Sequence, residues 1–305
     1  MSDINDFIIE DGVLTKYVGH GGDIVIPDSV VQIGDYVFSH SKITSIAIPD
    51  SVTNIGYGTF IRCESLKSIT LPNSIREIHD DVFCCCSSLT EIVIHNSVSK
   101  LGQRVFDDCT SLSVVILPDS LIEIDVQAFR GCTSLADENG FVIVRGVLYD
   151  YIGKESIISI PSGIIEISAC AFLGNTNLTS VCIPSSVKHI GWRAFLGCTS
   201  LHSIEIPHNV KTIDYEVFEG CCSLCSVLLP EGLRKISHGT FKNCKSLLEI
   251  VIPNTITHIE SVILFEGCNS LADIYFCGSE DEWRRIENVA SIPDGIRIHY
   301  EHKIM

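Results

Sequence analysis

The sequence predicts a β-rich solenoid of about ten repeats of 23 residues, each with one short parallel strand. Two observations lead to this fold class. First, an anchor residue recurs at steps of 22 or 23, apart from one gap of 43, at Pro27, Pro49, Pro72, His95, Pro118, Pro161, Pro184, Pro207, Pro230 and Pro253. Second, the residues one and three positions before each anchor are apolar throughout. Because side chains two positions apart lie on the same side of a strand, each repeat should form a strand with one buried side.

The part of each repeat that follows the anchor is also periodic. Branched apolar residues three and six positions after it should cover a second side of the coil. A phenylalanine then recurs at Phe38, Phe60, Phe83, Phe106, Phe129, Phe172, Phe195, Phe218, Phe241 and Phe265. Stacked in successive coils, these rings should form a continuous spine, and each buried ring should contribute roughly 2 to 3 kcal/mol to stability.

Cysteine occupies a fixed place three residues after most of these phenylalanines. The column contains Cys63, Cys86, Cys109, Cys132, Cys198, Cys221, Cys244 and Cys268, and a leucine follows three residues later. Ser41 and Asn175 are the exceptions. Free cysteine is among the most buried residue types and its thiol is a weak donor, so we interpret this column as structural.

The repeat resembles the BspA-type leucine-rich-repeat family. The resemblance rests on segments such as Ser68 to Ile78 followed by a Phe-x-x-Cys-x-Ser-Leu segment such as Phe106 to Leu112, and it covers nearly the whole chain. It implies a right-handed coil or horseshoe-like solenoid. It also implies a role in adhesion or host-matrix binding outside the cell.

The gap of 43 residues indicates an internal duplication. Residues 141–161 match residues 7–27 without any change in length, and each copy centres on a pair of residues that predicts a turn, Asp11-Gly12 or Arg145-Gly146. We therefore expect one continuous solenoid over 1–305. Its parts would be an N-terminal hairpin cap (1–27), repeats 1–5 (28–140), an internal hairpin (141–161), repeats 6–10 (162–272) and a C-terminal cap (273–305).

The last segment departs from the repeat. Ser279 followed three residues later by Glu282 has the spacing of a capping box, which predicts a short helix. Trp283 and Ile286 should lie on the inner side of this helix. Since the end of a solenoid core must be covered, we assign Trp283 to the cap rather than to a ligand.

Composition limits the partners and the compartment. A net charge of -17 repels the phosphates of nucleic acids and anionic lipids, and no apolar run is long enough to insert into a membrane. The start of the chain lacks the features of a secretory signal, and fifteen cysteines favour a reducing compartment. If this is the full natural chain, we expect it in the cytoplasm, whereas the family resemblance allows a secreted or cell-surface protein.

The chain shows no pattern that indicates an enzyme. The cysteines that we can place lie in repeat columns without a histidine and an orienting partner in one cleft. Cys222 and Cys225 have the only paired spacing that resembles half of a zinc site, which needs four converging ligands. We expect no catalytic residues, no metal and no cofactor.

The candidate binding residues are those that project outward from the predicted strands. Most are small and polar, but apolar or charged residues interrupt the two outward columns at Val93, Val114, Ile116, Glu205, Leu228 and Val251. Exposed apolar patches mark interaction sites, although a hairpin or a neighbouring subunit could also cover them. The sequence thus predicts a non-enzymatic protein-binding module, monomeric or weakly dimeric. The alternatives are an intracellular scaffold or a thiol or metal enzyme.

Overall fold

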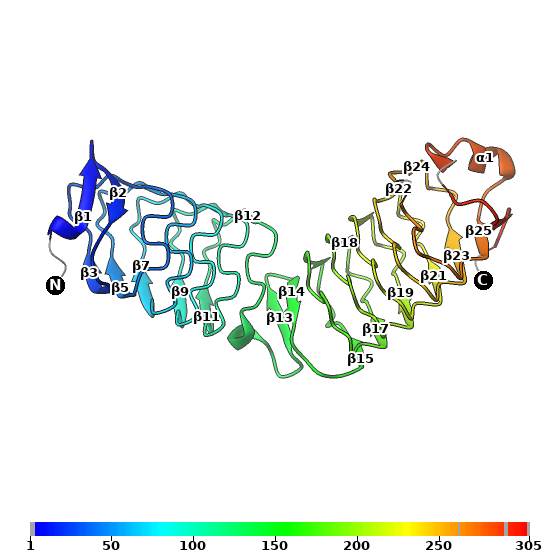
Figure 1. The fold of residues 1–305 in the computed structure, drawn as a ribbon, viewed down its shortest axis with the longest axis horizontal. Coiled ribbons are helices and arrows are strands. Elements are labelled where there is room, and N and C mark those ends of the chain that lie inside the picture. The colour runs from blue at the N-terminus through cyan, green and yellow to red at the C-terminus, as the bar shows by residue number, and fades with distance from the viewer. Residues whose placement is uncertain (1–3, 262, 290–291, 304–305) are drawn as a thin grey trace. The chain divides into compact units, whose positions relative to one another are not determined.

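The computed structural model describes residues 4–261, 263–289 and 292–303. The chain forms a β-solenoid of about 12 turns with almost no helix, which confirms the predicted fold class. It divides into two units, residues 1–143 and residues 144–305. Each unit is a stack of coils, with one hairpin near the start of unit 1 and a second hairpin at the boundary between the units (Figure 1).

Unit 1 places the predicted strands side by side. They are β3 (Gly22–Val25), β5 (Ile43–Ala47), β7 (Ser68–Thr70), β9 (Glu91–Val93) and β11 (Val114–Ile116). β3, β5 and β7 form one parallel sheet, and β9 and β11 form another. The hydrogen-bonded ladder is therefore interrupted between β7 and β9.

A second row of very short strands follows the anchors of unit 1. These are β4 (Gln32–Ile33), β6 (Asn54–Ile55), β8 (Glu77–Ile78), β10 (Lys100–Leu101) and β12 (Glu123–Ile124). They hold the apolar residue six positions after each anchor. Ile33, Ile55, Ile78 and Leu101 are buried, which confirms that this column covers a second side of the coil.

Unit 2 repeats this arrangement. Its long row contains β15 (Ile157–Ser159), β17 (Ser180–Cys182), β19 (Ser203–Glu205), β21 (Ser226–Leu228), β23 (Glu249–Ile252), β25 (Asp273–Phe276) and β26 (Arg297–His299). Its short row contains β16 (Glu166–Ile167), β18 (His189–Ile190), β20 (Thr212–Ile213), β22 (Lys235–Ile236) and β24 (His258–Ile259). Both ladders are interrupted between the coils of β19 and β21. β25 and β26 extend the long row beyond the tenth repeat, so the C-terminal segment continues the solenoid as well as closing it.

Both hairpins form as the sequence predicts. β1 (Phe7–Glu10), which follows the short 3-10 helix η1 (Ile4–Asp6), pairs antiparallel with β2 (Val13–Tyr17). β13 (Phe141–Val144) is hydrogen bonded to β14 (Val147–Tyr151), and a second 3-10 helix, η2 (Thr133–Leu135), precedes it. Both turn residues have left-handed backbones in each hairpin, with φ of 50° and 79° at Asp11 and Gly12 and of 50° and 76° at Arg145 and Gly146. This conformation suits a two-residue turn because its twist matches that of the strands.

The phenylalanine spine is continuous within each unit. Successive ring centroids are 5.4 to 5.5 Å apart from Phe38 to Phe129 and 4.8 to 6.0 Å apart from Phe172 to Phe265. Each stack begins on a hairpin tyrosine, since Tyr17 contacts Phe38 at 5.0 Å and Tyr151 contacts Phe172 at 5.5 Å. The hairpins thereby cover the first ring of each spine.

Each column thiol is a donor to the coil before it. Cys109 Sγ donates to the Phe83 carbonyl at 3.0 Å, and all eight column cysteines make the equivalent bond over 2.9 to 3.2 Å. Ser41 and Asn175 stand in the first coil after a hairpin, where the preceding ring belongs to a tyrosine. Asn175 instead accepts the backbone N–H groups of residues 177 and 178 through Oδ1. The two exceptions therefore mark the start of each stack.

The C-terminal closing segment also forms as expected. The helix α1 (Glu280–Arg284) begins at Ser279 with a complete capping box, in which Ser279 Oγ accepts the Glu282 N–H and the Glu282 carboxylate accepts the Ser279 N–H. Trp283 is buried against Phe276 with the rings edge to face, 5.2 Å apart. Among the described residues, no helix has the length and apolar character that crossing a membrane requires.

Candidate functional site

The outward side of the long strand row is the candidate binding surface, which we call the strand face. In β9, β15, β19 and β21 the central residue is buried and the two flanking residues are exposed. The alternation follows from the two-residue period of a strand with one side against the core. The six candidate residues all lie on the strand face, five of them at an end of their strand and Val251 inside β23.

Three of the candidates meet in unit 1. β9 and β11 pair in register, so Ile116 lies beside Val93 and Val114 lies beside Glu91. The side chains of Val93, Val114 and Ile116 are 44%, 45% and 54% exposed. We call Val93, Val114 and Ile116 the unit 1 patch. The structure therefore places side by side the three residues that the sequence separates by up to 23 positions.

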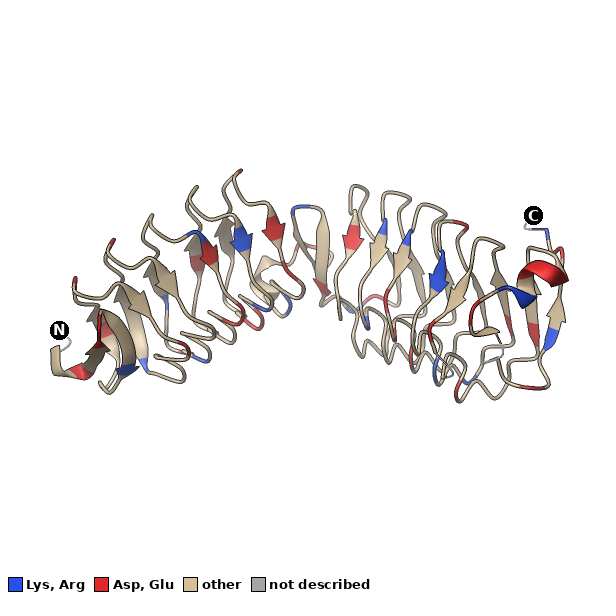
Figure 2. Ribbon diagram, turned by 90° about the horizontal axis from the view of Figure 1, so that it is seen from above, with Lys and Arg blue, Asp and Glu red and all other residues tan. Residues whose placement is uncertain are grey.

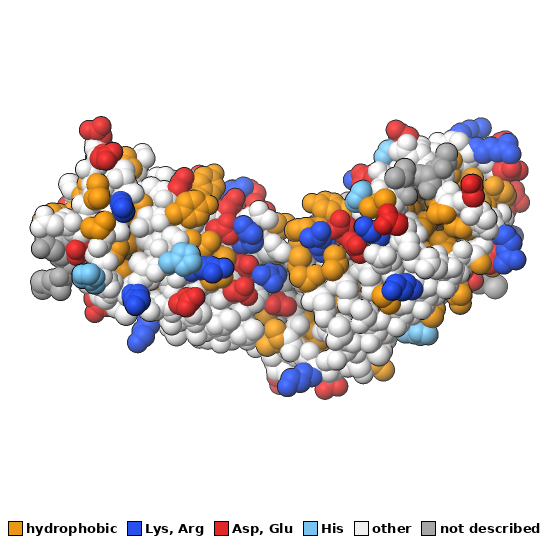
Figure 3. All heavy atoms as spheres, in the orientation of Figure 1, with side chains coloured by type: hydrophobic (Ala, Val, Ile, Leu, Met, Phe, Trp, Pro, Cys, Tyr) orange, Lys and Arg blue, Asp and Glu red, His pale blue; other side chains and the backbone are white. Residues whose placement is uncertain are grey.

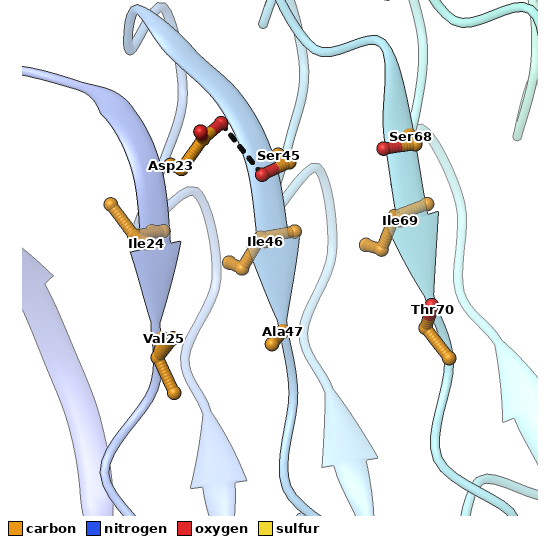
Figure 4. A pocket seen from close by; sticks show the side chains of 9 residues that line it. All are labelled: Asp23, Ile24, Val25, Ser45, Ile46, Ala47, Ser68, Ile69 and Thr70. Carbon is orange, nitrogen blue, oxygen red and sulfur yellow. Dashed lines mark hydrogen bonds between the residues drawn. The ribbon is translucent and has the colours of Figure 1, made fainter. Parts of the chain in front are cut away.

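The strand face of unit 1 is hollowed along its length. A hollow of about 660 Å³ lies over β3, β5 and β7 (Figure 4). A second of about 300 Å³ lies over β7 and β9 and shares Ser68, Ile69 and Thr70 with the first. A third of about 380 Å³ shares Val93 and His95 with the second and reaches the residues after β11. Together they make a shallow groove across the coils.

Asp23 is the charged group of the first hollow. Its Oδ1 accepts the hydroxyls of Thr44 and Ser45, each at 2.7 Å, and the Ser45 bond is drawn in Figure 4. These two hydrogen bonds hold the pKa of the Asp23 carboxyl below its usual value. The group is therefore a carboxylate at neutral pH.

The remaining candidates lie in unit 2. β21 pairs with β23, so Leu228 is beside Val251, and Leu228 is 40% exposed. Val251 is only partly exposed, because Tyr275 on β25 flanks it on the other side. Val251 is thus a half-buried member of the outward column. Glu205 lines a hollow of about 470 Å³ together with Cys182 and Leu228, although β19 and β21 are not joined by ladder hydrogen bonds.

Charges on the side of the short strands are compensated locally. Figure 2 shows acidic and basic residues interleaved along this side. Lys100 Nζ lies 2.8 Å from Glu123 on β12, and Lys235 Nζ lies 2.7 Å from Glu260. His189 lies 3.0 Å from Asp214 and 3.5 Å from Glu166, and these two carboxylates raise the pKa of the His189 ring to about 9. Such ion pairs across coils stabilise the stack and do not indicate catalysis.

The thiols do not form a catalytic arrangement in the described part of the chain. Burial raises the pKa of Cys63 to about 11 and that of Cys198 to about 12, so both are protonated at neutral pH. Cys225 Sγ lies 3.6 Å from His202 Nδ1, but no described side chain orients the ring from its other nitrogen, as a nucleophilic pair needs. No three His, Cys, Asp or Glu side chains of the described residues converge as metal ligands.

Sequence reasoning missed the hollows and a row of polar residues that borders them. Directly after each anchor of unit 1 comes an exposed Asp or Asn, at Asp28, Asp50, Asn73, Asn96 and Asp119. Asp119 lines the third hollow with Val93 and Ile116. The signal was present as a column of Asp and Asn one position after the anchor. Its relation to the patch depends on the turn geometry, which a repeat alignment does not provide.

The comparisons with known proteins identify the family. The family model described as "BspA type Leucine rich repeat region (6 copies)" matches residues 20–136 and 147–279. The chain therefore belongs to the BspA-type leucine-rich-repeat family. No curated protein matches the sequence.

Solved structures show the same fold. A leucine rich cell surface protein from Faecalibacterium prausnitzii is 29% identical, with 92% of this chain and 95% of that chain covered and a TM-score of 0.50. A leucine-rich repeat protein from Eubacterium ventriosum is 19% identical, with 97% and 92% covered and a TM-score of 0.57. The pneumococcal vaccine antigen PcpA is 19% identical, with 91% and 73% covered and a TM-score of 0.55.

Proposed function

We propose that the chain is a non-enzymatic protein-binding module of adhesion type, and that it binds its partner on the strand face. The observation that supports this most directly is the unit 1 patch, where three large apolar side chains are exposed next to each other above a shallow groove. Exposed contiguous apolar side chains are costly in water and are typical of interaction surfaces. The likeness to a protein described as a cell-surface protein supports the adhesion role.

The test measures binding to a panel of purified extracellular-matrix proteins. The native chain is compared with a Val93→Ser/Ile116→Ser variant, in which both residues are already exposed, so the fold should remain intact. A matched control, Ile122→Ser, removes an exposed isoleucine that lies outside the strand face and is 88% exposed. We expect Val93→Ser/Ile116→Ser to lose most of its binding to the matrix proteins and Ile122→Ser to bind as the native chain does. Equal binding by all three chains would contradict the proposal.

An intracellular scaffold is the second candidate, and the cysteine thiols support it. No two of the fifteen described cysteines form a disulfide, and eight of them donate the thiol hydrogen, which a disulfide would remove. Reduced cysteines of this number are typical of a reducing compartment. Fractionation of the source cells with an antibody against the chain separates the two candidates. Recovery from the cell surface supports adhesion, and recovery from the cytoplasm supports the scaffold.

A further inference from the structure

The strand face of unit 1 and the row directly after its anchors contain acidic residues but no lysine or arginine. The strand face and the row directly after the anchors contain Asp23, Glu91, Asp28, Asp50 and Asp119. All the Lys and Arg residues of unit 1 lie elsewhere, at Lys16, Lys42, Arg62, Lys67, Arg76, Lys100, Arg104 and Arg130. Among the described residues, no basic side chain lies within ion-pair distance of those five carboxylates.

Carboxylates elsewhere in unit 1 do form ion pairs with lysine or arginine. Arg104 lies 2.8 Å from Asp81, Arg130 lies 2.9 Å from Asp107, and Lys100 lies 2.8 Å from Glu123. Asp81, Asp107 and Glu123 are thus each paired with a basic residue of a neighbouring coil. Among the described residues, the carboxylates of the strand face and of the row after the anchors form no such ion pair, although the more distant charge of Lys67 contributes to the lowered pKa of Asp23.

The unpaired carboxylates border the apolar patch. Glu91 is the register partner of Val114, and Asp119 lines the same hollow as Val93 and Ile116. A ligand seated on Val93 and Ile116 would therefore have two carboxylates at its margin. A second copy of this chain does not fit, because the same face of the copy would oppose carboxylates with carboxylates at a net charge of -17 per chain.

From these observations we infer that the partner of unit 1 is a polypeptide segment in which lysine or arginine alternates with apolar side chains. Its apolar side chains pack on the unit 1 patch, and its cations pair with Glu91 and Asp119. The inference rests on the proposed function and specifies the chemistry of the partner. Complementary charge at the rim of an interface selects the partner and speeds encounter, while the apolar centre supplies most of the affinity.

The experiment measures binding of two fluorescent peptides to the full chain by anisotropy. One peptide alternates lysine with valine, and the other has glutamate in place of each lysine. We expect the lysine peptide to bind and its affinity to fall as NaCl rises, because salt screens exposed charge pairs. Equal or tighter binding of the glutamate peptide would overturn the inference.

Two double variants test whether the peptide binds at Glu91 and Asp119. Glu91→Gln/Asp119→Asn should weaken the lysine peptide about fivefold at low salt, as expected for two exposed ion pairs. Glu77→Gln/Glu123→Gln removes the same charge from the side of the short strands and should leave the affinity unchanged. If both double variants weaken binding equally, the effect comes from net charge and the inference fails.

The two proposals fail in different ways. In one outcome, Val93→Ser/Ile116→Ser loses binding to matrix proteins, whereas Glu91→Gln/Asp119→Asn binds both the matrix proteins and the lysine peptide as the native chain does. This outcome would keep the strand face as the binding site and reject a basic partner. Unchanged binding in both variants would reject the strand-face function as well. Parallel loss in both, with retention in the Glu77→Gln/Glu123→Gln control, supports both proposals.

Discussion

The cysteine column shows how one side chain can serve packing and hydrogen bonding together. Cys86, Cys109 and Cys221 are fully buried, and burial raises the pKa of each thiol well above its usual value. A protonated thiol is a poor nucleophile but a usable donor. The same burial that makes these residues unreactive therefore preserves the hydrogen that each donates to the preceding coil.

We predict a sharp contrast in thiol labelling. At pH 8 the exposed Cys182 should react with iodoacetamide in the folded chain, whereas Cys63, Cys86 and Cys109 should react only after denaturation. Because the pKa of Cys63 is raised to about 11, only about one molecule in a thousand would have the thiolate there at pH 8. Mass spectrometry of the labelled peptides gives the extent at each site. Labelling of folded Cys109 as fast as Cys182 would contradict the buried column.

Phe83 is a second residue whose side chain should contribute strongly to the free energy of unfolding. Its ring is fully buried between those of Phe60 and Phe106, with centroids 5.5 Å away on each side. Phe83→Ala should lower the free energy of unfolding by about 3 to 5 kcal/mol, because it leaves a cavity in the spine. Urea denaturation followed by circular dichroism measures the change. The exposed Ile122→Ala should change it by less than about 0.5 kcal/mol.

At the scale of the element, the coils from Phe38 to Phe241 turn through residues with left-handed backbone two positions before and two positions after the phenylalanine. Two positions after it stand five glycines with positive φ, at Gly131, Gly174, Gly197, Gly220 and Gly267. Arg62 at φ 57° and Asn243 at φ 60° adopt the same conformation without being glycine. We call this position, two residues after the phenylalanine, the corner. The coil imposes a positive φ there even where the residue does not favour it.

A pair of substitutions tests this corner. A Cβ at Gly197 would meet its nearest neighbour at 3.6 Å, so Gly197→Ala introduces backbone strain without a clash and should cost about 1 kcal/mol. Arg62→Gly in the same column should have the opposite sign and stabilise by roughly 0.5 kcal/mol. Chemical denaturation of both variants compares them. The same sign for the two would show that side-chain contacts, rather than φ, determine the effect.

The elements were predictable where the sequence is periodic. The apolar columns around Ile46, the hairpin turn at Asp11-Gly12 and the capping box at Ser279 all have local signatures, and the structure confirms them. The two-residue strands such as β6 were not predicted as strands, because two residues show no alternation. The positive φ at Arg62 was not predicted either, because an arginine in the sequence gives no indication of a left-handed backbone.

The candidate surface was predictable only in part. Alternation along β9 and β11 correctly placed Val93 and Ile116 outward. The partial burial of Val251 was not foreseen, because it depends on Tyr275, which belongs to a segment outside the repeat. Which of the outward residues bind a partner stays a prediction, to be tested by the variants above.

At the scale of the whole molecule, net charge opposes the compact state. With 38 acidic and 21 basic residues, like charges repel over the surface, and Figure 3 shows charged side chains distributed over one face of the molecule. We predict that raising NaCl from low to physiological concentration raises the unfolding midpoint by about 2 °C, because it screens this repulsion. Differential scanning calorimetry measures it. A lower midpoint in salt would mean that the ion pairs between coils outweigh the repulsion.

The direction of the thiol hydrogen bond has a consequence for how the chain is made. In every repeat with a column cysteine the donor belongs to the later coil and the acceptor carbonyl to the earlier one. A ribosome releases the earlier coil first, so the acceptor is already in place when the new cysteine emerges. Each added repeat can dock on a finished template, and the stack can grow from its hairpin at the pace of translation.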